Sequence, residues 1–267
     1  MQPIHAAILG IIEGLTEYLP VSSTGHLILA SAWLGLQGEA VNAFEIVIQS
    51  GAILAVLGLY RAQVARILRG MLGQDAAGRR LGLNLLVSFA PAVVAGLALH
   101  RQVKTLLFSP WPVAAALALG GAAILVLDGP LRRKTAASPM TLETLRVQDA
   151  LLIGIVQCLA LWPGTSRAMV TLLAGMCVGL PAPAAAEYSF LLALPMLGAA
   201  TAFDALKSGR VLLHDVGAAS LAIGLAVSAI VAALAVAGFV RYLSRRGLAV
   251  FGWYRIVLAG AVWWVMR

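Results

Sequence analysis

The sequence contains little charge and few cysteines. Aspartate, glutamate, lysine and arginine make up 11% of its 267 residues, whereas 61% of the residues are hydrophobic. An ordinary soluble domain carries roughly 25% charged residues, so this chain lacks the charges that a water-exposed surface needs. The low charge excludes a cytosolic enzyme and a disordered chain. The two cysteines, Cys158 and Cys177, lie inside apolar runs and exclude a secreted disulfide scaffold. The composition therefore predicts a polytopic membrane protein.

Basic residues outnumber acidic ones and give a formal net charge of +8. An excess of positive charge can indicate a nucleic-acid partner. Here the basic residues stand mainly in short segments between apolar runs, where they would meet the membrane surface. We therefore expect no nucleic-acid partner, and we expect the lipid bilayer to surround the chain.

Six apolar runs are long enough to cross a bilayer, which takes about 20 residues with a range of 17 to 25. They lie near 43–60, 83–99, 112–127, 184–206, 216–240 and 251–266. Each is expected to be a membrane-spanning helix, and the third and sixth runs are the shorter ones.

Two further apolar regions, about 6–35 and 150–180, are each interrupted in the middle. Proline, glycine and hydroxyl residues break them at 19–26 and 162–167. Proline cannot continue a helix, and the freed backbone groups cannot face lipid. Both regions are therefore predicted to be re-entrant helical hairpins. The expected fold is an all-α polytopic membrane protein with six transmembrane helices plus two re-entrant helical hairpins.

The distribution of basic residues predicts the orientation of this arrangement. Twelve lysines and arginines fall on one side and five on the side that carries both termini. Because basic residues accumulate in cytoplasmic loops, both termini are predicted to lie outside. The two broken regions also resemble each other when Pro20 is aligned with Pro163. We therefore predict one integral membrane domain with an inverted-topology repeat, in which 1–127 and 128–267 each hold one hairpin and three spans.

Glu13 and Glu17 are the first candidates for chemistry. They are four residues apart and share a face of a helix. A carboxylate in the centre of a spanning helix costs about 2.5–3.5 kcal/mol, so such residues are usually functional. A divalent cation held by these carboxylates and by phosphate oxygens is the use we favour. The alternative is a pair that lines a wet vestibule without a chemical role.

Hydroxyl residues and a histidine follow Pro20 at the first break. A helix start with free N–H groups and several hydroxyls is typical of an anion site. His26 lies three residues beyond Ser23, close enough on one helical face to act as its base. The alternative is a plain helix cap made by Ser22 or Ser23, with His26 merely hydrogen-bonded. The candidate residues here are Ser22, Ser23, Thr24, Gly25 and His26.

Arg167 follows the second break and is costly to bury without an anion. Arginine binds phosphate in a bidentate way, so the second break is predicted to supply the other half of a phosphate clamp. Its candidate residues are Gly164, Thr165, Ser166, Arg167 and Thr171. The alternative is a structural ion pair between Arg167 and Glu13 or Glu17. Arg255, beside Tyr254, is interpreted as an interfacial anchor, although an inward-facing arginine there would assist a diphosphate.

Two segments carry a resemblance to a known family. The segment 13–26, EGLTEYLPVSSTGH, resembles the first signature of the bacterial undecaprenyl-diphosphate phosphatase (bacitracin-resistance) family, and 157–167, QCLALWPGTSR, resembles the second. The resemblance extends over essentially the whole chain. It implies a multi-pass enzyme of the bacterial inner (plasma) membrane that removes the terminal phosphate of undecaprenyl diphosphate, a lipid carrier of cell-wall synthesis. It also implies a divalent cation, Mg²⁺ or Ca²⁺, and is compatible with a homodimer.

The resemblance assigns roles to individual residues. Glu13 and Glu17 would bind metal or act as acid and base, and Ser23 would be the nucleophile or position a water. His26 would be the acid/base partner of Ser23, and Arg167 would hold the phosphates and stabilise the transition state. A serine nucleophile, a histidine nucleophile and a metal-activated water all remain open.

The second signature departs from the family pattern at one point. Ala168 and Met169 follow Arg167, where the family commonly has Ser-Gly, so one phosphate-binding hydroxyl is missing. A transporter or flippase of prenyl phosphates with the same inverted repeat is the alternative function. Ser23 beside His26 and the carboxylates favours the enzyme, because a carrier needs a binding site but no nucleophile.

Overall fold

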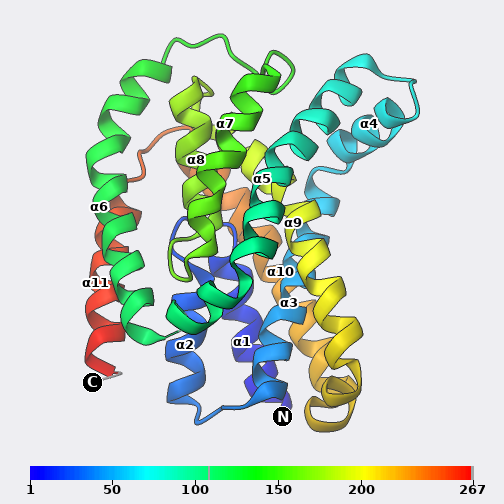
Figure 1. The fold of residues 1–267 in the computed structure, drawn as a ribbon, viewed down its shortest axis with the longest axis vertical. Coiled ribbons are helices and arrows are strands. Elements are labelled where there is room, and N and C mark those ends of the chain that lie inside the picture. Colours follow the sequence, from blue (N-terminus) through cyan, green and yellow to red (C-terminus); the bar gives the residue numbers. More distant parts are fainter. Residues whose placement is uncertain (108, 266–267) are drawn as a thin grey trace.

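The structure, a computed structural model, describes residues 1–107 and 109–265 and is helical throughout the described elements (Figure 1). The first half contains α1 (Pro3–Thr16), α2 (Ser23–Trp33), α3 (Glu39–Leu59), α4 (Arg61–Met71), α5 (Ala76–Leu106) and α6 (Pro110–Thr135). The second half contains α7 (Val147–Gln157), the 3₁₀ turn Cys158–Leu161, α8 (Arg167–Val178), α9 (Ala182–Val211), a π turn at Leu212–Val216, α10 (Ala218–Leu243) and α11 (Ala249–Val265).

Five helical segments are long and apolar enough to cross a membrane. They are Glu39–Leu59, Ala76–Leu99, Trp111–Thr135, Ala182–Val216 and Ala218–Leu243. Each overlaps one of the first five predicted spans. The sixth predicted span, 251–266, coincides with the 17-residue α11, which is shorter, and its last residue lies outside the described residues.

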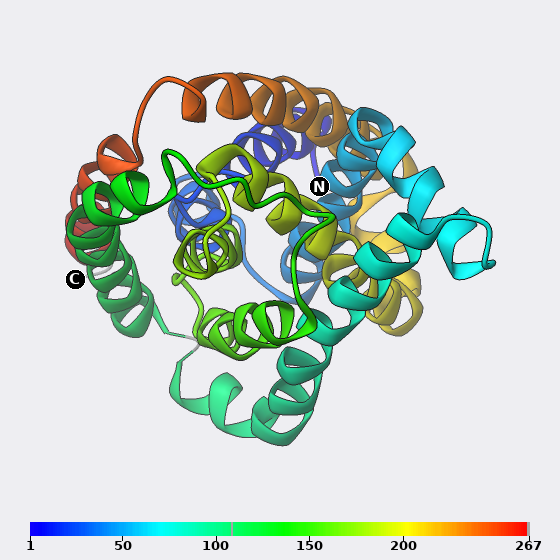
Figure 2. The same ribbon diagram turned by 90° about the horizontal axis from the view of Figure 1, so that it is seen from above.

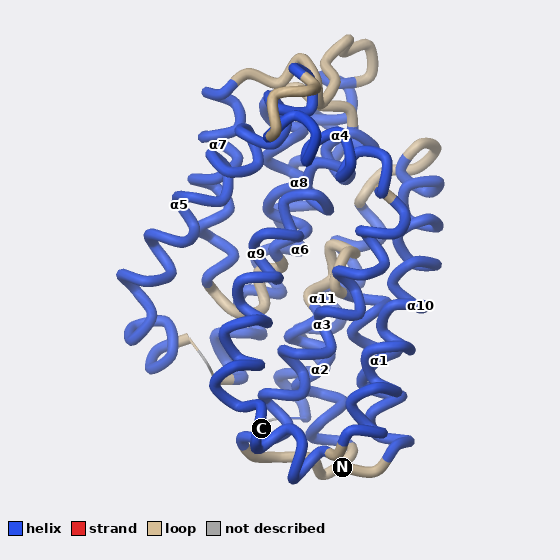
Figure 3. Tube along the Cα trace, turned by 90° about the vertical axis from the view of Figure 1, so that its right-hand side faces the viewer, coloured by secondary structure: helices blue, strands red, loops and turns tan. Residues whose placement is uncertain are grey.

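The remaining apolar helices form two pairs that enter the molecule from opposite ends. Figure 1 shows α1 and α2 in the half of the molecule that holds the N-terminus, and α7 and α8 in the other half. Figure 3 shows the same arrangement from the side, with the long helices running along one common direction. The two interruptions, between α1 and α2 and between α7 and α8, therefore meet in the middle of the molecule.

Helix α8 is the most enclosed element. Its residues from Ala168 to Met176 are all buried, and Figure 2 shows this helix inside a ring of the longer ones. The largest cluster of buried side chains surrounds α8 and the first half of α9. Arg167, the first residue of α8, is thereby held at the centre of the protein.

Small residues let α1 pack closely on α10. Gly10 and Gly14, four residues apart on α1, face Gly224 and Ser228 of α10; an added Cβ would lie 2.7 Å from the Gly224 carbonyl oxygen and 2.5 Å from that of Ser228. Apolar helices gain little hydrophobic energy from meeting each other in lipid, so close backbone packing is a main source of their association. This packing fixes the helix that carries Glu13.

The turn between α4 and α5 is held by Asp75. Its carboxylate caps α5 by accepting a hydrogen bond of 2.8 Å from the Gly78 N–H, and it also accepts one of 3.4 Å from Arg66 Nε. The bond from Gly78 is the largest cause that lowers the pKa of Asp75 below its ordinary value, and Arg66 adds to it. Asp75 is therefore charged at neutral pH.

We expect Gly14→Ala to destabilise the protein, whereas Gly238→Ala leaves it unchanged or slightly stabilises it. Gly238 also lies inside a helix, but nothing stands within 4 Å of the position of its added Cβ. An extra methyl group in a tightly packed contact lowers the folding stability by about 1–3 kcal/mol. Replacing a glycine inside a helix by alanine raises it by roughly 0.5–1 kcal/mol when there is space for the methyl group. Thermal unfolding in detergent measures both variants. Equal melting temperatures for the two variants would contradict the close α1–α10 packing.

Candidate active site

The two helix breaks share an unusual backbone conformation. Ser22 and Ser166 precede α2 and α8 with φ of 71° and 73°, and they are the only non-glycine residues with positive φ in the described part of the chain. Each Oγ accepts a hydrogen bond from the N–H three residues later, at 3.5 Å from Gly25 and 3.2 Å from Met169. A serine in this conformation is strained by about 1–3 kcal/mol, so the surrounding structure must hold it. Both serines are helix caps, as the alternative interpretation of the first break predicted for Ser22.

This shared conformation changes which residues of the two breaks are equivalent. Alignment of Pro20 with Pro163 pairs Ser22 with Thr165, whereas the backbone conformation pairs Ser22 with Ser166. The difference arises because the position of the cap, rather than the position of the proline, sets where each second helix begins. Ser23 and Arg167 are consequently the equivalent first residues of α2 and α8.

The Glu17 carboxylate joins the two breaks. Its Oε2 accepts a hydrogen bond of 2.8 Å from Ser23 Oγ, and its Oε1 accepts one of 3.2 Å from Arg167 Nη2. The Glu17 and Arg167 side chains are only 7% and 9% exposed, so this ion pair is largely shielded from water. The structure thus brings together three of the predicted site residues. It also forms the Arg167–Glu17 ion pair that the alternative interpretation predicted.

The Arg167 side chain also contacts residues outside α8. Its Nη1 donates to the Ser189 carbonyl of α9 at 2.9 Å, and its guanidinium carbon lies 5.7 Å from the centre of the Tyr18 ring. Its Nε is buried and has no hydrogen-bond partner among the described residues. The Thr171 hydroxyl donates to the Arg167 carbonyl at 2.8 Å and lies 2.5 Å from Ser189 Oγ. Thr171 therefore supports the start of α8, and its hydroxyl has protein partners instead of a free position for phosphate.

Glu13 lies one turn before Glu17 on α1. It is completely buried, and neither of its carboxylate oxygens has a hydrogen-bond partner in the described chain. Glu17 follows four residues later and shares its face of the helix. A buried carboxylate without a partner is costly, so Glu13 indicates a position for a cation or a proton.

The carboxylates also decide whether a divalent cation fits. Within the part of the chain that the structure describes, no group of three or more His, Cys, Asp or Glu side chains is arranged to hold a metal. Mg²⁺ does not require such a group, because it keeps several waters and binds one or two carboxylates together with substrate phosphates. The free oxygens of Glu13 beside the Glu17 carboxylate match that donor set. The residues therefore fit a cation that is held jointly with a phosphate ligand.

His26 does not pair with Ser23. Its Nδ1 lies 2.7 Å from the Ser22 carbonyl oxygen and its Nε2 lies 2.6 Å from the Tyr254 hydroxyl. The two rings also stack, with centroids 5.5 Å apart and an angle of 8°. The predicted Ser23–His26 contact is replaced by a Ser23–Glu17 contact, because the His26 ring turns toward α11.

Arg255 is completely buried, so its interpretation as an interfacial anchor was wrong. Its two terminal nitrogens lie within hydrogen-bond distance of four backbone carbonyls. These are Pro20 at 3.3 Å, Ala116 at 3.1 Å, Gly164 at 3.0 Å and Thr165 at 3.0 Å. One side chain from α11 thus satisfies carbonyls of both breaks and of α6.

The other predicted residues have mainly structural surroundings. Gly25 faces Leu117 of α6, where an added Cβ would lie 3.1 Å from a side-chain carbon. Gly164 has φ of 93°, which favours glycine, and Thr165 contributes its carbonyl to Arg255. Thr24 is half-buried in the first turn of α2.

Comparison with known proteins shows the family. The family described as bacitracin resistance protein BacA matches residues 6–261. The chain belongs to the BacA family.

Named relatives agree with this assignment. The chain is 51% identical over 261 residues to the undecaprenyl-diphosphatase of Sorangium cellulosum, covering 97% of this chain and 85% of that protein. It is 46% identical over 254 residues to undecaprenyl-diphosphatase 2 of Rhodospirillum rubrum, covering 95% and 91% of the two chains. It is also 43% identical over 270 residues to the undecaprenyl-diphosphatase of Rhizorhabdus wittichii, covering 100% and 99%.

The departure at Ala168 and Met169 lies in the interior of this BacA-family chain. Ala168 is 2% exposed and Met169 is 4% exposed, and Met169 belongs to the largest buried cluster. Apolar packing therefore occupies these positions. The Glu17–Ser23–Arg167 contacts form without a hydroxyl at position 168.

Sequence reasoning missed two contributions to the site. Ser189 lies in the apolar α9, and no pattern in the sequence around it indicates that it would contact Arg167. Arg255 did carry a signal, because it is the one charged residue in the run 251–266. A charge in the middle of an apolar run has to face the protein interior.

We expect Arg255→Met to destabilise the protein by about 3 kcal/mol or more, because buried carbonyls of both breaks then lack a donor. Arg255→Lys retains one or two of the bonds and should fall between the wild type and Arg255→Met. Arg133→Met, at an exposed position near the end of α6, is the matched control. Thermal unfolding in detergent measures all three. An Arg255→Met protein as stable as the control would contradict a joining role for Arg255.

Proposed function

We propose that the chain is an undecaprenyl-diphosphatase. It hydrolyses the terminal phosphate of undecaprenyl diphosphate to give undecaprenyl phosphate and inorganic phosphate, which recycles the lipid carrier of cell-wall synthesis and confers bacitracin resistance. The observation that carries this proposal is the contact of Glu17 with both Ser23 and Arg167 where the two breaks meet. A site of this kind at the depth of the membrane suits a substrate with its tail in lipid and its diphosphate in a polar pocket.

The geometry supports a separate chemical role for each residue. Arg167 binds the phosphates, because its guanidinium already faces a carboxylate that a phosphate can replace. Ser23 attacks the terminal phosphorus or orients the attacking water. Glu17 is placed to accept the Ser23 proton, since it accepts the Ser23 hydrogen bond at 2.8 Å. His26, with its Tyr254 contact, is the remaining acid/base candidate at the site.

A divalent cation, Mg²⁺ or Ca²⁺, completes the proposed site. Glu13 and Glu17 would hold it, and when bound it would neutralise phosphate charge during the reaction. Charge balance supports this proposal, because Arg167 is the only basic side chain in hydrogen-bond contact with the carboxylates of the described site. A diphosphate beside two carboxylates needs more positive charge than Arg167 alone supplies.

We also propose that the membrane arrangement is six spans plus two re-entrant hairpins in two inverted repeats, 1–127 and 128–267. The matching Ser22 and Ser166 conformations and the opposite entry of the two hairpins support it. The termini would lie outside the inner membrane, with the end that carries α4 in the cytoplasm. The basic residues gathered at that end support this orientation.

Phosphate release from undecaprenyl diphosphate in detergent with Mg²⁺ tests the activity. We expect Glu17→Gln, Ser23→Ala and Arg167→Lys each to lose about 100-fold or more, since each removes a group that acts on the reacting phosphate. Ser244→Ala, at an exposed position near the end of α10, is the control and should keep full activity. Near-normal release by Ser23→Ala would exclude the serine nucleophile. Substrate binding by folded wild-type protein without any release would favour the transporter.

The cation is tested by titrating Mg²⁺ into the wild type and Glu13→Gln. We expect EDTA to abolish release by the wild type. Glu13→Gln should need about tenfold or more Mg²⁺ for half-maximal activity, because it loses one anionic ligand. Full activity of the wild type in EDTA would contradict the metal assignment, whatever the behaviour of the variant.

A further inference from the structure

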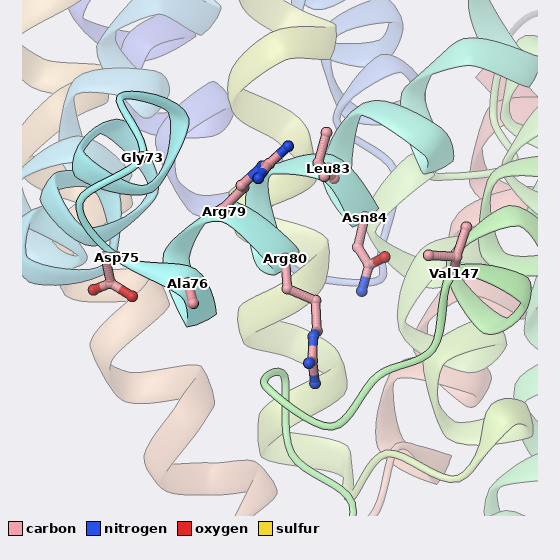
Figure 4. Close-up of a pocket in the computed structure, with 8 residues that line it drawn as sticks. All are labelled: Gly73, Asp75, Ala76, Arg79, Arg80, Leu83, Asn84 and Val147. Atoms are coloured by element: carbon pink, nitrogen blue, oxygen red, sulfur yellow. The ribbon is translucent and has the colours of Figure 1, made fainter.

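A second candidate site lies at the end of the molecule far from the termini. A cavity of about 390 Å³ is bounded by the turn before α5, the first turns of α5 and the start of α7 (Figure 4). The apolar segment of α5 begins at Ala76, so this cavity stands where a membrane-spanning helix meets the surface. The proposed active site contains none of its lining residues.

The cavity has positive charge that the protein does not neutralise. Asp75, which lines the cavity, pairs with Arg66 at 3.4 Å, and Arg66 also pairs with Glu143 at 2.8 Å. These three side chains together carry one negative charge, so Arg79 and Arg80 give the group a net charge of +1. The Arg80 side chain donates only to the Glu143 backbone carbonyl at 3.2 Å, and the Arg79 side chain has no hydrogen bond or ion pair to any described residue. The two arginines leave α5 in different directions, with the cavity beside both (Figure 4).

A buried amide in the cavity wall also lacks a partner. Asn84 is completely buried, and its Nδ2 donates to the Leu145 carbonyl at 2.9 Å. Its Oδ1 accepts no hydrogen bond from any described residue. Figure 4 shows the amide between Arg80 and Val147. An unpaired buried acceptor costs about 1–3 kcal/mol, which a ligand that carries a hydroxyl donor would recover.

Apolar side chains complete the cavity on the membrane side. Leu83 is 42% exposed and Val147 is 56% exposed, and both line the cavity. Free phosphate would gain nothing from them, whereas an acyl chain would cover them. The lining therefore combines two arginines without a carboxylate partner, the Asp75 carboxylate that Arg66 pairs with, one acceptor for a hydroxyl donor, and an apolar edge.

We propose that this cavity binds the headgroup of an anionic phospholipid of the phosphatidylglycerol class. Its phosphate would lie between Arg79 and Arg80, its headgroup hydroxyl would donate to Asn84 Oδ1, and its acyl chain would contact Leu83 and Val147. The lipid would brace the segment before α7, since Arg80 and Asn84 both bind that segment. This proposal does not depend on the catalytic function.

The test is retention of added dioleoyl phosphatidylglycerol by the full chain in dodecyl maltoside, followed by native mass spectrometry and thermal unfolding. We expect Arg79→Gln/Arg80→Gln to lose about tenfold or more in apparent affinity, because each basic side chain near an anionic membrane surface contributes about fivefold. Arg132→Gln/Arg133→Gln removes the same charge from the exposed end of α6 at the same end of the molecule and should bind like the wild type.

Further measurements identify the ligand. Phosphatidylcholine should bind and stabilise more weakly than phosphatidylglycerol, and inorganic phosphate should not reproduce the stabilisation. Asn84→Asp, which keeps the size of the side chain, should weaken phosphatidylglycerol binding because it places a negative charge beside the phosphate. An equal loss of phosphatidylglycerol affinity in both double variants would show that only the net charge of the protein matters, and would overturn the proposed binding site. Full stabilisation by inorganic phosphate would overturn the lipid assignment.

Discussion

The structure depends on the contact between one buried guanidinium and the carbonyls of two broken helices. A helix that breaks inside a membrane leaves carbonyls that lipid cannot satisfy, and a buried arginine without partners is equally unfavourable. In this chain the Arg255 guanidinium donates to the carbonyls of Pro20 in the first break and of Gly164 and Thr165 in the second. The carbonyls thereby gain a donor and the arginine gains acceptors. The C-terminal helix α11 thus fixes how the two breaks meet.

The contacts of the candidate site follow from that meeting. Glu17 and Arg167 are 150 residues apart in sequence, yet their side chains lie 3.2 Å apart. Neither break could form this pair alone, because Glu17 stands beside the first break and Arg167 follows the second. The enclosure of α8 and the close packing of α1 on α10 then hold the two sides of the pair in place.

Composition and local pattern predicted the features that depend on nearby residues. The apolar runs predicted six spans, five of which are long apolar helices in the structure, and proline and glycine predicted both breaks. The cost of burying charge singled out Glu13, Glu17 and Arg167. Features that depend on which helices are neighbours were not predictable in this way. The partner of Ser23 proved to be Glu17 instead of His26, since the orientation of the His26 ring is set by Tyr254, 228 residues away.

The equivalence of Ser22 and Ser166 gives the site its electrostatic character. Each serine turns the chain so that a new helix starts at the centre of the protein, with Ser23 and Arg167 as the first helical residues. A helix start carries partial positive charge and free N–H groups, so two such starts favour an anion between them. The Glu17 carboxylate accepts hydrogen bonds from the side chains of both first residues. A phosphate that enters the site would therefore meet donors already arranged around a negative charge.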